Sequence, residues 1–299
     1  MEEGARYRVM HETVYLYSSP IATSRQIAHL TPRETRWQKV ISHQLEVRPS
    51  PVERAEGVDY FGNSYSRLVV DTPHDELVVR SACEVIVMPH APAPGAESPP
   101  WESALAEPGV WTGLNLDVEQ YRVASPAVPL LPSTRDYAAK CFAPKRAWLA
   151  AMLELTQRIR KEFEYDTEVT TVSTSVEEVL SLKRGVCQDF AHLMLSSLRS
   201  LGLPARYVSG YVLNRRKEGK DSNTGGDASH AWVASYCAPH GWVAFDPTNG
   251  KIADTEFVTL GWGREYHDVS PLRGVVRGSA AQQLAVSVSV VPVENEANV

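Results

Sequence analysis

Hydrophobic and polar residues alternate along the first third of the chain. This alternation, rich in β-branched and aromatic residues, covers residues 7–17, 40–47, 66–70 and 76–87, and it is typical of strands that bury one face. Turn sequences rich in Ser, Pro, Gly and Asn separate these stretches. Short strands at this spacing favour an antiparallel β-sandwich over residues 1–95.

The pattern becomes helical after residue 144. Apolar residues recur every three or four positions between residues 145 and 164, as on one face of an amphipathic helix. A second helix is expected over residues 175–182, where a serine stands three residues before Glu178, the spacing of a capping box. A third is expected over residues 190–201, because a glycine and then a proline follow it.

Strand patterns then return over residues 206–213, 231–236, 242–245 and 283–291. The segment between the first two of these, residues 214–227, is polar, charged and rich in glycine, which predicts a mobile loop. Strands and helices in this order predict an α+β protein in which a helix packs on an antiparallel sheet.

Two Pro-rich stretches help to divide the chain, because proline fits neither a helix interior nor a central strand. The predicted parts are an N-terminal β-sandwich domain, a connecting segment, an α+β core and a C-terminal tail that carries a strand. Their expected bounds are residues 1–95, 96–144, 145–260 and 261–299.

Composition and charge narrow the function. The chain has 299 residues and a net charge of −6, whereas nucleic-acid-binding proteins are usually basic or carry a basic stripe. The same charge argues against binding to anionic membranes. The sequence shows neither a secretory signal nor an apolar run long enough to span a bilayer, so we expect a cytoplasmic protein without a membrane partner.

The four cysteines, at positions 83, 141, 187 and 237, are expected to be free thiols. No Cys-x-x-Cys pair occurs, and the nine histidines are scattered without a His-Glu-x-x-His motif. No calcium-binding loop of the Asp-x-Asp-x-Asp-Gly type is visible either. We therefore expect neither a bound metal nor another cofactor.

One cysteine has an unusual context. In the stretch RGVCQDFAHL, Cys187 follows a glycine and precedes an apolar helix. A thiol at a helix N-terminus feels the positive end of the helix dipole, which favours the nucleophilic thiolate. The backbone N–H of Cys187 is also free to donate to an oxyanion. The alternative is a cysteine that only packs in the core.

A nucleophilic cysteine requires a histidine partner. His192 lies five helical residues away and faces a different side, whereas His230 stands at the start of a strand that follows the polar loop. The strands at 231–236 and 242–245 are close enough in sequence to form a hairpin, which brings His230 and Asp246 to its open end. Asp246 is then placed to orient the imidazole, although an Asp-Pro pair alone indicates only a turn.

These residues resemble the transglutaminase-like superfamily of papain-like cysteine enzymes. Three sequence blocks carry the resemblance: RGVCQDFAH around Cys187, SHAW around His230, and GWVAFDPTN around Asp246, with spacings of 230 − 187 = 43 and 246 − 230 = 16 residues. The β region before the core and the tail GREYHDVSPLRG resemble bacterial members. The tail has Glu265 where the resemblance leads us to expect aspartate.

The resemblance implies a papain-like core with a Cys187, His230 and Asp246 triad. It also implies Tyr165 as a candidate second oxyanion donor beside the Cys187 backbone; the alternative for Tyr165 is core packing. Asp189 is expected to stabilise the first turn of the helix.

The expected reaction is cleavage of an amide, peptide or isopeptide bond in a peptide or protein substrate through a thioacyl-enzyme. Transglutamination of a glutamine substrate with an amine co-substrate uses the same triad, so it stays open as an alternative. A binding module on this fold is a third alternative. An exposed strand edge also allows a homodimer.

Overall fold

The structure is a computed structural model. It describes residues 4–93, 95–105, 113–171, 173–213, 229–238 and 240–293. The loop predicted at 214–227 lies outside the described residues.

Two four-stranded antiparallel sheets form the N-terminal part of the molecule. The first runs in the order β15 (Gln282–Pro292), β1 (Ala5–Ile21), β6 (His74–Val87) and β3 (Gln38–Arg48). The second runs in the order β14 (Leu272–Arg277), β2 (Thr23–Ala28), β5 (Ser64–Val70) and β4 (Glu53–Val58).

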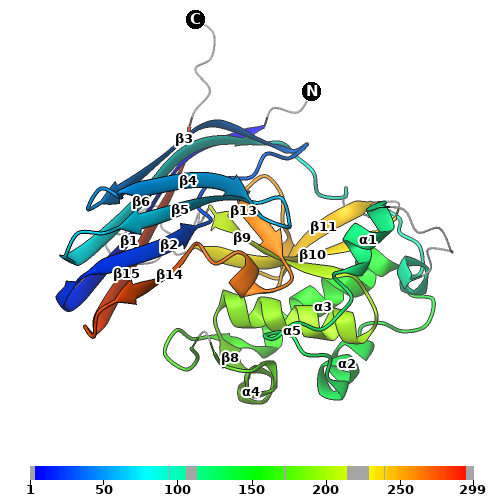
Figure 1. The fold of residues 1–299 in the computed structure, drawn as a ribbon. Helices are drawn as coiled ribbons and strands as arrows, with labels where there is room; N and C mark the ends of the chain where they lie inside the picture. The colour runs from blue at the N-terminus through cyan, green and yellow to red at the C-terminus, as the bar shows by residue number, and fades with distance from the viewer. Residues whose placement is uncertain are drawn as a thin grey trace, which may run out of the picture.

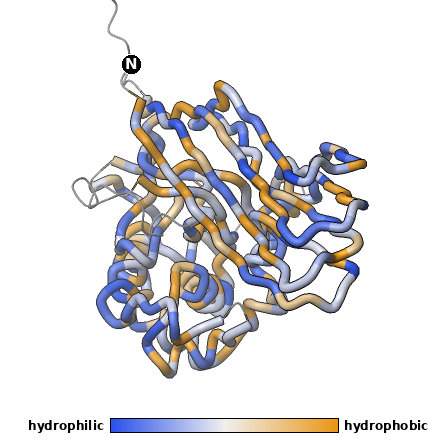
Figure 2. Tube along the Cα trace, turned by 90° about the vertical axis from the view of Figure 1, so that its left-hand side faces the viewer, coloured by the Kyte–Doolittle hydropathy of each residue, from blue (hydrophilic) through white to orange (hydrophobic). Residues whose placement is uncertain are grey.

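Side-chain alternation explains why these strands form two layers around one core. Along β6, every second residue from Leu77 to Val87 is buried while those between are partly exposed, and Figure 2 shows hydrophobic and hydrophilic positions alternating along the strands. Val9 and Val79 of the first sheet pack in the same buried cluster as Leu68 and Val70 of the second. Burial of this apolar surface is the main force that holds the two sheets together.

The C-terminal tail belongs to these two sheets. In the first sheet Val9 of β1 pairs with Cys83 of β6 on one side and with Val290 of β15 on the other, and β14 pairs with β2. The sequence predicted one strand in the tail, at 283–291, but the structure has two. β14 was missed because five of its six residues are exposed, which leaves no hydrophobic alternation to detect.

A third sheet has five strands and positions the candidate site. Its order is β12 (Lys251–Ile252), β11 (Gly241–Asp246), β10 (His230–Cys237), β9 (Ala205–Val212) and β13 (Phe257–Gly263). The helices lie on one side of this sheet and the two N-terminal sheets on the other (Figure 1). Strands β12 and β13 were not predicted, and neither were β2 and β4 of the second sheet.

Four helices are gathered on the helical side: α2 (Pro132–Ala139), α3 (Trp148–Glu162), α4 (Val176–Leu182) and α5 (Cys187–Ser200). Helix α5 is the central one, because Leu193, Met194, Leu195 and Leu198 are all fully buried. The capping box predicted for α4 is confirmed, since the Ser175 hydroxyl accepts from Glu178 N–H and the Glu178 carboxylate accepts from Ser175 N–H.

The remaining elements are short. They are η1 (Trp101–Leu105), α1 (Gly113–Glu119), β7 (Glu164–Tyr165), β8 (Arg184–Gly185) and η3 (Tyr266–Asp268). Strands β7 and β8 pair in parallel just before α5. Within the described ranges, no helix has the length and apolar character needed to cross a membrane.

Candidate active site

Cys187 is the first residue of helix α5, and the preceding turn is built around Asp189. Oδ2 of Asp189 accepts hydrogen bonds from the Val186 N–H at 2.8 Å and from the Thr170 hydroxyl at 2.7 Å. A Cβ at position 185 would lie only 2.7 Å from the same oxygen, so glycine is required there. This arrangement fixes the backbone that carries Cys187, and it agrees with the helix-start role expected for Asp189.

His230 and Asp246 meet at one end of the third sheet. His230 is the first residue of β10 and Asp246 the last residue of β11, and these antiparallel strands are adjacent, with Val233 opposite Phe245. His230 Nε2 lies 2.9 Å from Asp246 Oδ2. The hairpin predicted from the sequence is therefore present.

The Asp246 carboxylate is fully buried and is held by the turn that follows it. Its Oδ1 accepts from the backbone N–H groups of Thr248 at 2.9 Å and Asn249 at 3.2 Å. The Asn249 side-chain amide donates to Oδ2 at 2.6 Å. Burial alone would raise the pKa of Asp246, but His230 and these donors outweigh it and the pKa lies below its usual value.

Asp246 also determines the charge of His230. Burial alone would lower the pKa of the imidazole. The Asp246 carboxylate and the Cys187 side chain together outweigh burial and raise this pKa to about 10. Because Nε2 faces Asp246, Nδ1 is the ring nitrogen left for Cys187. The histidine is thus favoured as an imidazolium next to the sulfur.

The other three cysteines have different surroundings. Cys83, Cys141 and Cys237 are buried, whereas Cys187 is partly exposed. Burial raises the pKa of Cys83 to about 12 and that of Cys237 to about 11, and it also raises the pKa of Cys141. Cys187 therefore combines access with a neighbouring imidazole, a combination that none of the other three thiols has.

Tyr165 and His192, which the sequence analysis considered alongside Cys187, His230 and Asp246, lie in different places. Tyr165 pairs with Gly185 across the β7–β8 ladder, which places its backbone two residues away from Cys187 in the neighbouring strand. Its side chain is 51% exposed, so it does not belong to the core. Burial, followed by the Cys187 and Asp189 charges, raises the pKa of its phenol to about 12, so the phenol keeps the proton that a donor needs. His192 is buried away from the sulfur, and its Nε2 accepts from Tyr266 N–H at 3.2 Å.

Several residues that contact His230, Asp246 or Asp189 were not singled out by the sequence analysis. Trp232 and Phe257 pack around the His230 ring, with ring centroids 6.0 and 6.3 Å away. Thr170 lies 19 residues before Asp189 and has no local signal. Asn249 could have been found, because an asparagine three residues after a turn-forming aspartate is placed to return a hydrogen bond to it.

Two family models match the chain. Residues 7–86 match the bacterial transglutaminase-like N-terminal region, and residues 135–247 match the transglutaminase-like superfamily. The second range contains Cys187, His230 and Asp246.

Individual relatives extend these matches over nearly the whole chain. An uncharacterized protein of Mycobacterium tuberculosis (strain ATCC 25618 / H37Rv) is 39% identical over 98% of this chain and 94% of its own length. The crystal structure of a "putative cysteine protease" from Cytophaga hutchinsonii superposes with a TM-score of 0.75, at 20% identity, over 99% of this chain and 93% of the other. The chain therefore belongs to the transglutaminase-like superfamily, and its fold is a transglutaminase-like core preceded by an N-terminal sheet domain.

A relative with a named activity is more distant. A protein-glutamine gamma-glutamyltransferase of Pseudomonas aeruginosa (strain PAO1) is 29% identical over 163 residues, which is 50% of this chain and 22% of that protein.

Proposed function

We propose that the protein is a cysteine hydrolase that cleaves an amide, peptide or isopeptide bond with Cys187, His230 and Asp246. The observation that carries the proposal is the buried 2.9 Å contact between His230 and Asp246, with Cys187 at the start of α5 against the same imidazole. A buried ion pair of this kind is costly to maintain for packing alone, but it suits an imidazole that must gain and lose a proton.

In the first half of the reaction, the Cys187 sulfur attacks the carbonyl carbon of the substrate. The C=O bond opens to a tetrahedral oxyanion, for which the Cys187 N–H at the start of α5 is one donor and the Tyr165 hydroxyl a second candidate. The intermediate collapses with cleavage of the C–N bond, and the His230 imidazolium gives its proton to the leaving amine. A thioester on Cys187 remains.

In the second half, neutral His230 takes a proton from water while the water oxygen attacks the thioester carbonyl. Cleavage of the C–S bond returns the sulfur as a thiolate beside the imidazolium and releases a carboxylic acid. Asp246 keeps the ring in one orientation through both proton transfers. The proposed substrate is a peptide or protein, and the partial exposure of Cys187 makes its sulfur accessible to such an amide.

Transamidation is the second candidate, and the distant gamma-glutamyltransferase relative favours keeping it. In that reaction, a primary amine attacks the thioester in place of water, and a new amide leaves the enzyme. The triad is the same, so the acceptor decides the outcome.

The test is timed alkylation with iodoacetamide at pH 7, followed by peptide mass mapping. Cys187 is expected to react at least tenfold faster than the buried Cys83, Cys141 and Cys237, which serve as internal controls in the same sample. His230→Ala is expected to slow the labelling of Cys187 by at least tenfold because it removes the imidazolium.

Two results would argue against catalysis. Equal labelling rates at all four cysteines, or a Cys187 rate that is the same in His230→Ala, would favour a binding module on this fold. If labelling is selective, glutamine peptides incubated with and without a primary amine then separate hydrolysis from transfer, through release of free acid or of the amine conjugate.

A further inference from the structure

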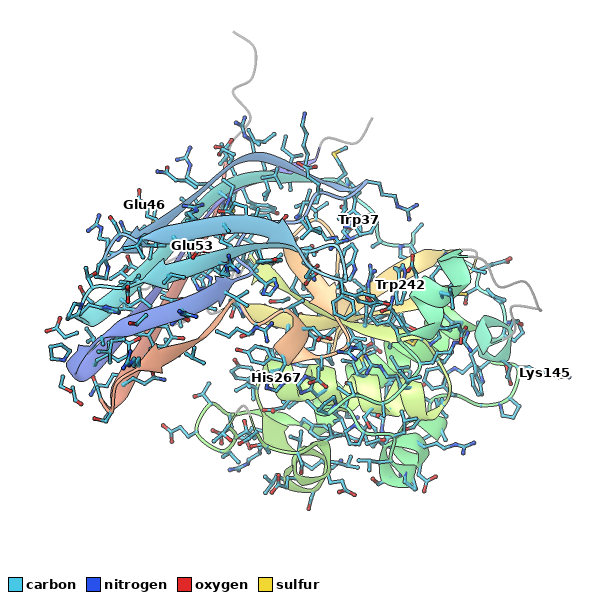
Figure 3. All side chains as sticks on the ribbon, in the orientation of Figure 1. Trp37, Glu46, Glu53, Lys145, Trp242 and His267 are labelled. Carbon is cyan, nitrogen blue, oxygen red and sulfur yellow. The ribbon has the colours of Figure 1, made fainter. Side chains whose placement is uncertain are left out.

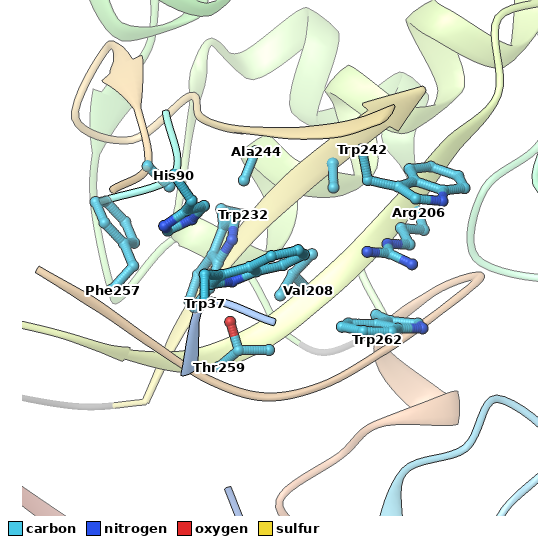
Figure 4. A pocket seen from close by; sticks show the side chains of 12 residues that line it. Trp37, His90, Arg206, Val208, Trp232, Trp242, Ala244, Phe257, Thr259 and Trp262 are labelled. Carbon is cyan, nitrogen blue, oxygen red and sulfur yellow. The ribbon is translucent and has the colours of Figure 1, made fainter. Parts of the chain in front are cut away.

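A small pocket lies on the face of the third sheet that is opposite to α5. It is found where the N-terminal sheets meet β9, β10 and β13. Four indoles line it: Trp37 from the segment before β3, Trp232 from β10, Trp242 from β11 and Trp262 from β13 (Figure 4). Figure 3 places Trp37 and Trp242 at this junction.

Arg206 of β9 enters this pocket as a buried cation. Only 6% of the residue is exposed. Its guanidinium carbon lies 4.2 Å from the centre of the Trp242 ring and 3.7 Å from that of Trp262. In Figure 4 the guanidinium lies between these two rings with its nitrogens directed towards the space beside Val208 and Trp37. The indoles cover the faces of the guanidinium, but its N–H groups point outward in the plane.

Those N–H groups have no acceptor among the described residues. No hydrogen bond or carboxylate partner is found for Arg206 in that part of the chain, and its buried Nε is unsatisfied. A stacked indole satisfies the charge in part, but it cannot accept in-plane hydrogen bonds. A buried donor without an acceptor is unfavourable, so the arrangement favours an external acceptor.

The surroundings do not supply the missing negative charge. Arg33 also stacks on Trp262, with its guanidinium carbon 3.6 Å from the ring centre, and it donates to Asn63 Oδ1 at 2.7 Å. Burial raises the pKa of the nearby Tyr121 phenol to about 12, so it is neutral at pH 7. His90, the other basic residue of the lining, already faces Asp254 at 3.5 Å.

Burial lowers the pKa of Arg206 to about 9, which still leaves the guanidinium charged at pH 7. The pocket therefore holds a positive charge, and its Nε–H group has no acceptor among the residues that the structure describes.

We propose that this pocket binds a monocarboxylate, with the carboxylate on the Arg206 guanidinium and its apolar carbon against the indoles. A carboxylate is planar and matches the guanidinium fork with two parallel hydrogen bonds. The pocket is partly open and has room for about one water-sized group inside, about 20 Å³. Only the charged head group of a ligand therefore fits inside, and its apolar part has to lie outside this space.

The site is distinct from the candidate active site in its chemistry. It shares Trp232 and Phe257 with the surroundings of His230, but binding requires neither Cys187 nor proton transfer. Its test is therefore a binding experiment, and the outcome does not depend on the proposed hydrolase activity.

The test compares benzoate with benzamide, its uncharged analogue of similar shape, in a buffer without carboxylates. Tryptophan fluorescence and the thermal unfolding midpoint are followed as each compound is added. Benzoate is expected to change the fluorescence saturably and to raise the midpoint, because a ligand that binds only the folded state stabilises it. Benzamide is expected to do neither. Equal responses to the two compounds would overturn the proposal.

Variants separate the guanidinium from its surroundings. Arg206→Met keeps the aliphatic stem between the indoles and is expected to weaken benzoate binding at least tenfold. Arg33→Met is the matched control, since it removes the other guanidinium stacked on Trp262, and its benzoate affinity should stay within threefold of the wild type. Benzoate binding by Arg206→Met at the wild-type affinity would contradict the proposal.

A measurement on the wild-type protein covers the case in which Arg206→Met does not fold. In protein labelled with ¹⁵N-arginine, benzoate is expected to shift one guanidinium Nε–H resonance strongly, while benzamide shifts none. Absence of any such shift at saturating benzoate would overturn the proposal.

The carboxylate has two plausible chemical sources, a free acid or the C-terminus of a peptide. Acetyl-Gly-Phe and its C-terminal amide, added in competition with benzoate, distinguish them. Stronger binding of the peptide acid than of benzoate indicates a chain end, and weaker binding of the peptide acid indicates a free acid. Displacement of benzoate by the peptide amide as effectively as by the acid would contradict a carboxylate site.

Discussion

At the scale of single residues, the orientation of His230 depends on how its carboxylate partner is held. Asp246 accepts three hydrogen bonds from Thr248 and Asn249 in addition to its contact with His230. Of these donors, only the Asn249 amide is a side chain, so it is the one that mutation can remove. Asn249 is thus a positioning residue, which acts on His230 through Asp246.

We predict that Asn249→Ala lowers the turnover of the amide substrate about tenfold, as expected for loss of a hydrogen bond to an orienting carboxylate. The Asn249 amide helps to keep the pKa of Asp246 low, so its removal should shift the acid limb of the pH–rate profile to higher pH. Thr248→Val is the control, because Thr248 contacts Asp246 through its backbone alone. An unchanged profile in Asn249→Ala would show that Asn249 has only a structural role.

Sequence reasoning proposed Cys187, His230 and Asp246 as a triad, and the structure places the three side by side because each is positioned by short-range rules. One lies at a helix start and the other two at the open end of a hairpin, and both features can be inferred from local patterns. The surroundings of Arg206 were not predicted, because an arginine in a strand gives no sign of which side chains the other strands of its sheet bring beside it. Only the structure shows that Trp242 of β11 and Trp262 of β13 stack on the guanidinium and that its Nε has no acceptor among the described residues.

At the scale of elements, the start of α5 depends on one buried carboxylate. Asp189 is 3% exposed. It lies in the first turn of α5 and joins this helix start, including the N-cap residue Val186, to the distant segment at Thr170. Its role is the usual one of an acidic residue near a helix N-terminus, where it accepts from N–H groups that the helix leaves unpaired.

We predict that Asp189→Ala lowers the free energy of unfolding by about 1–3 kcal/mol, because it leaves the Val186 N–H and the Thr170 hydroxyl without their acceptor. It should also slow alkylation of Cys187, whose backbone then loses its support. Thr170→Val removes one of the two donors and should cost less. Urea unfolding of the three proteins measures the differences, and equal stability of Asp189→Ala and wild type would refute the prediction.

Two of the missed strands, β13 and β14, differ from the predicted ones in how they are buried, whereas β2 buries alternate residues and was missed nonetheless. Strands such as β1 and β6 bury alternate residues, which is the pattern that sequence reasoning detects. In β13, six of seven residues are buried, and in β14 five of six are exposed, so neither alternates. Their strand conformation is imposed by neighbours that are distant in sequence, β9 and β2.

At the scale of the whole molecule, buried histidines make stability sensitive to acid. His11 is 1% exposed and joins the first sheet to the third, since its Nδ1 lies 3.0 Å from the Tyr211 hydroxyl and its Nε2 3.0 Å from that of Thr13. Burial lowers the pKa of both His11 and His192 to about 4. Unfolding returns each to a pKa near 6.5, so the unfolded chain binds more protons between pH 6.5 and 4.

We predict that the free energy of unfolding falls as the pH is lowered from 6.5 towards 4. Replacing one of these histidines by glutamine should make the fall shallower, because one proton-linked group is removed. Urea unfolding at several pH values, on wild type and His192→Gln, measures the two slopes. Parallel slopes would show that His192 does not take part. His230 acts in the opposite window: its pKa of about 10 favours the folded state below pH 6.5, and that contribution is lost as the pH rises through 10.

The pairing of β14 and β15 with β2 and β1 has a consequence for biosynthesis. Residues 272–292 leave the ribosome after residues 5–87, yet they supply one edge strand to each of the two sheets whose other strands are made first. Until they emerge, β1 and β2 of the nascent chain lack a neighbour on one side. An unpaired strand edge is a template for pairing with other chains, so a ribosome that stalls before residue 272 leaves a product prone to aggregation.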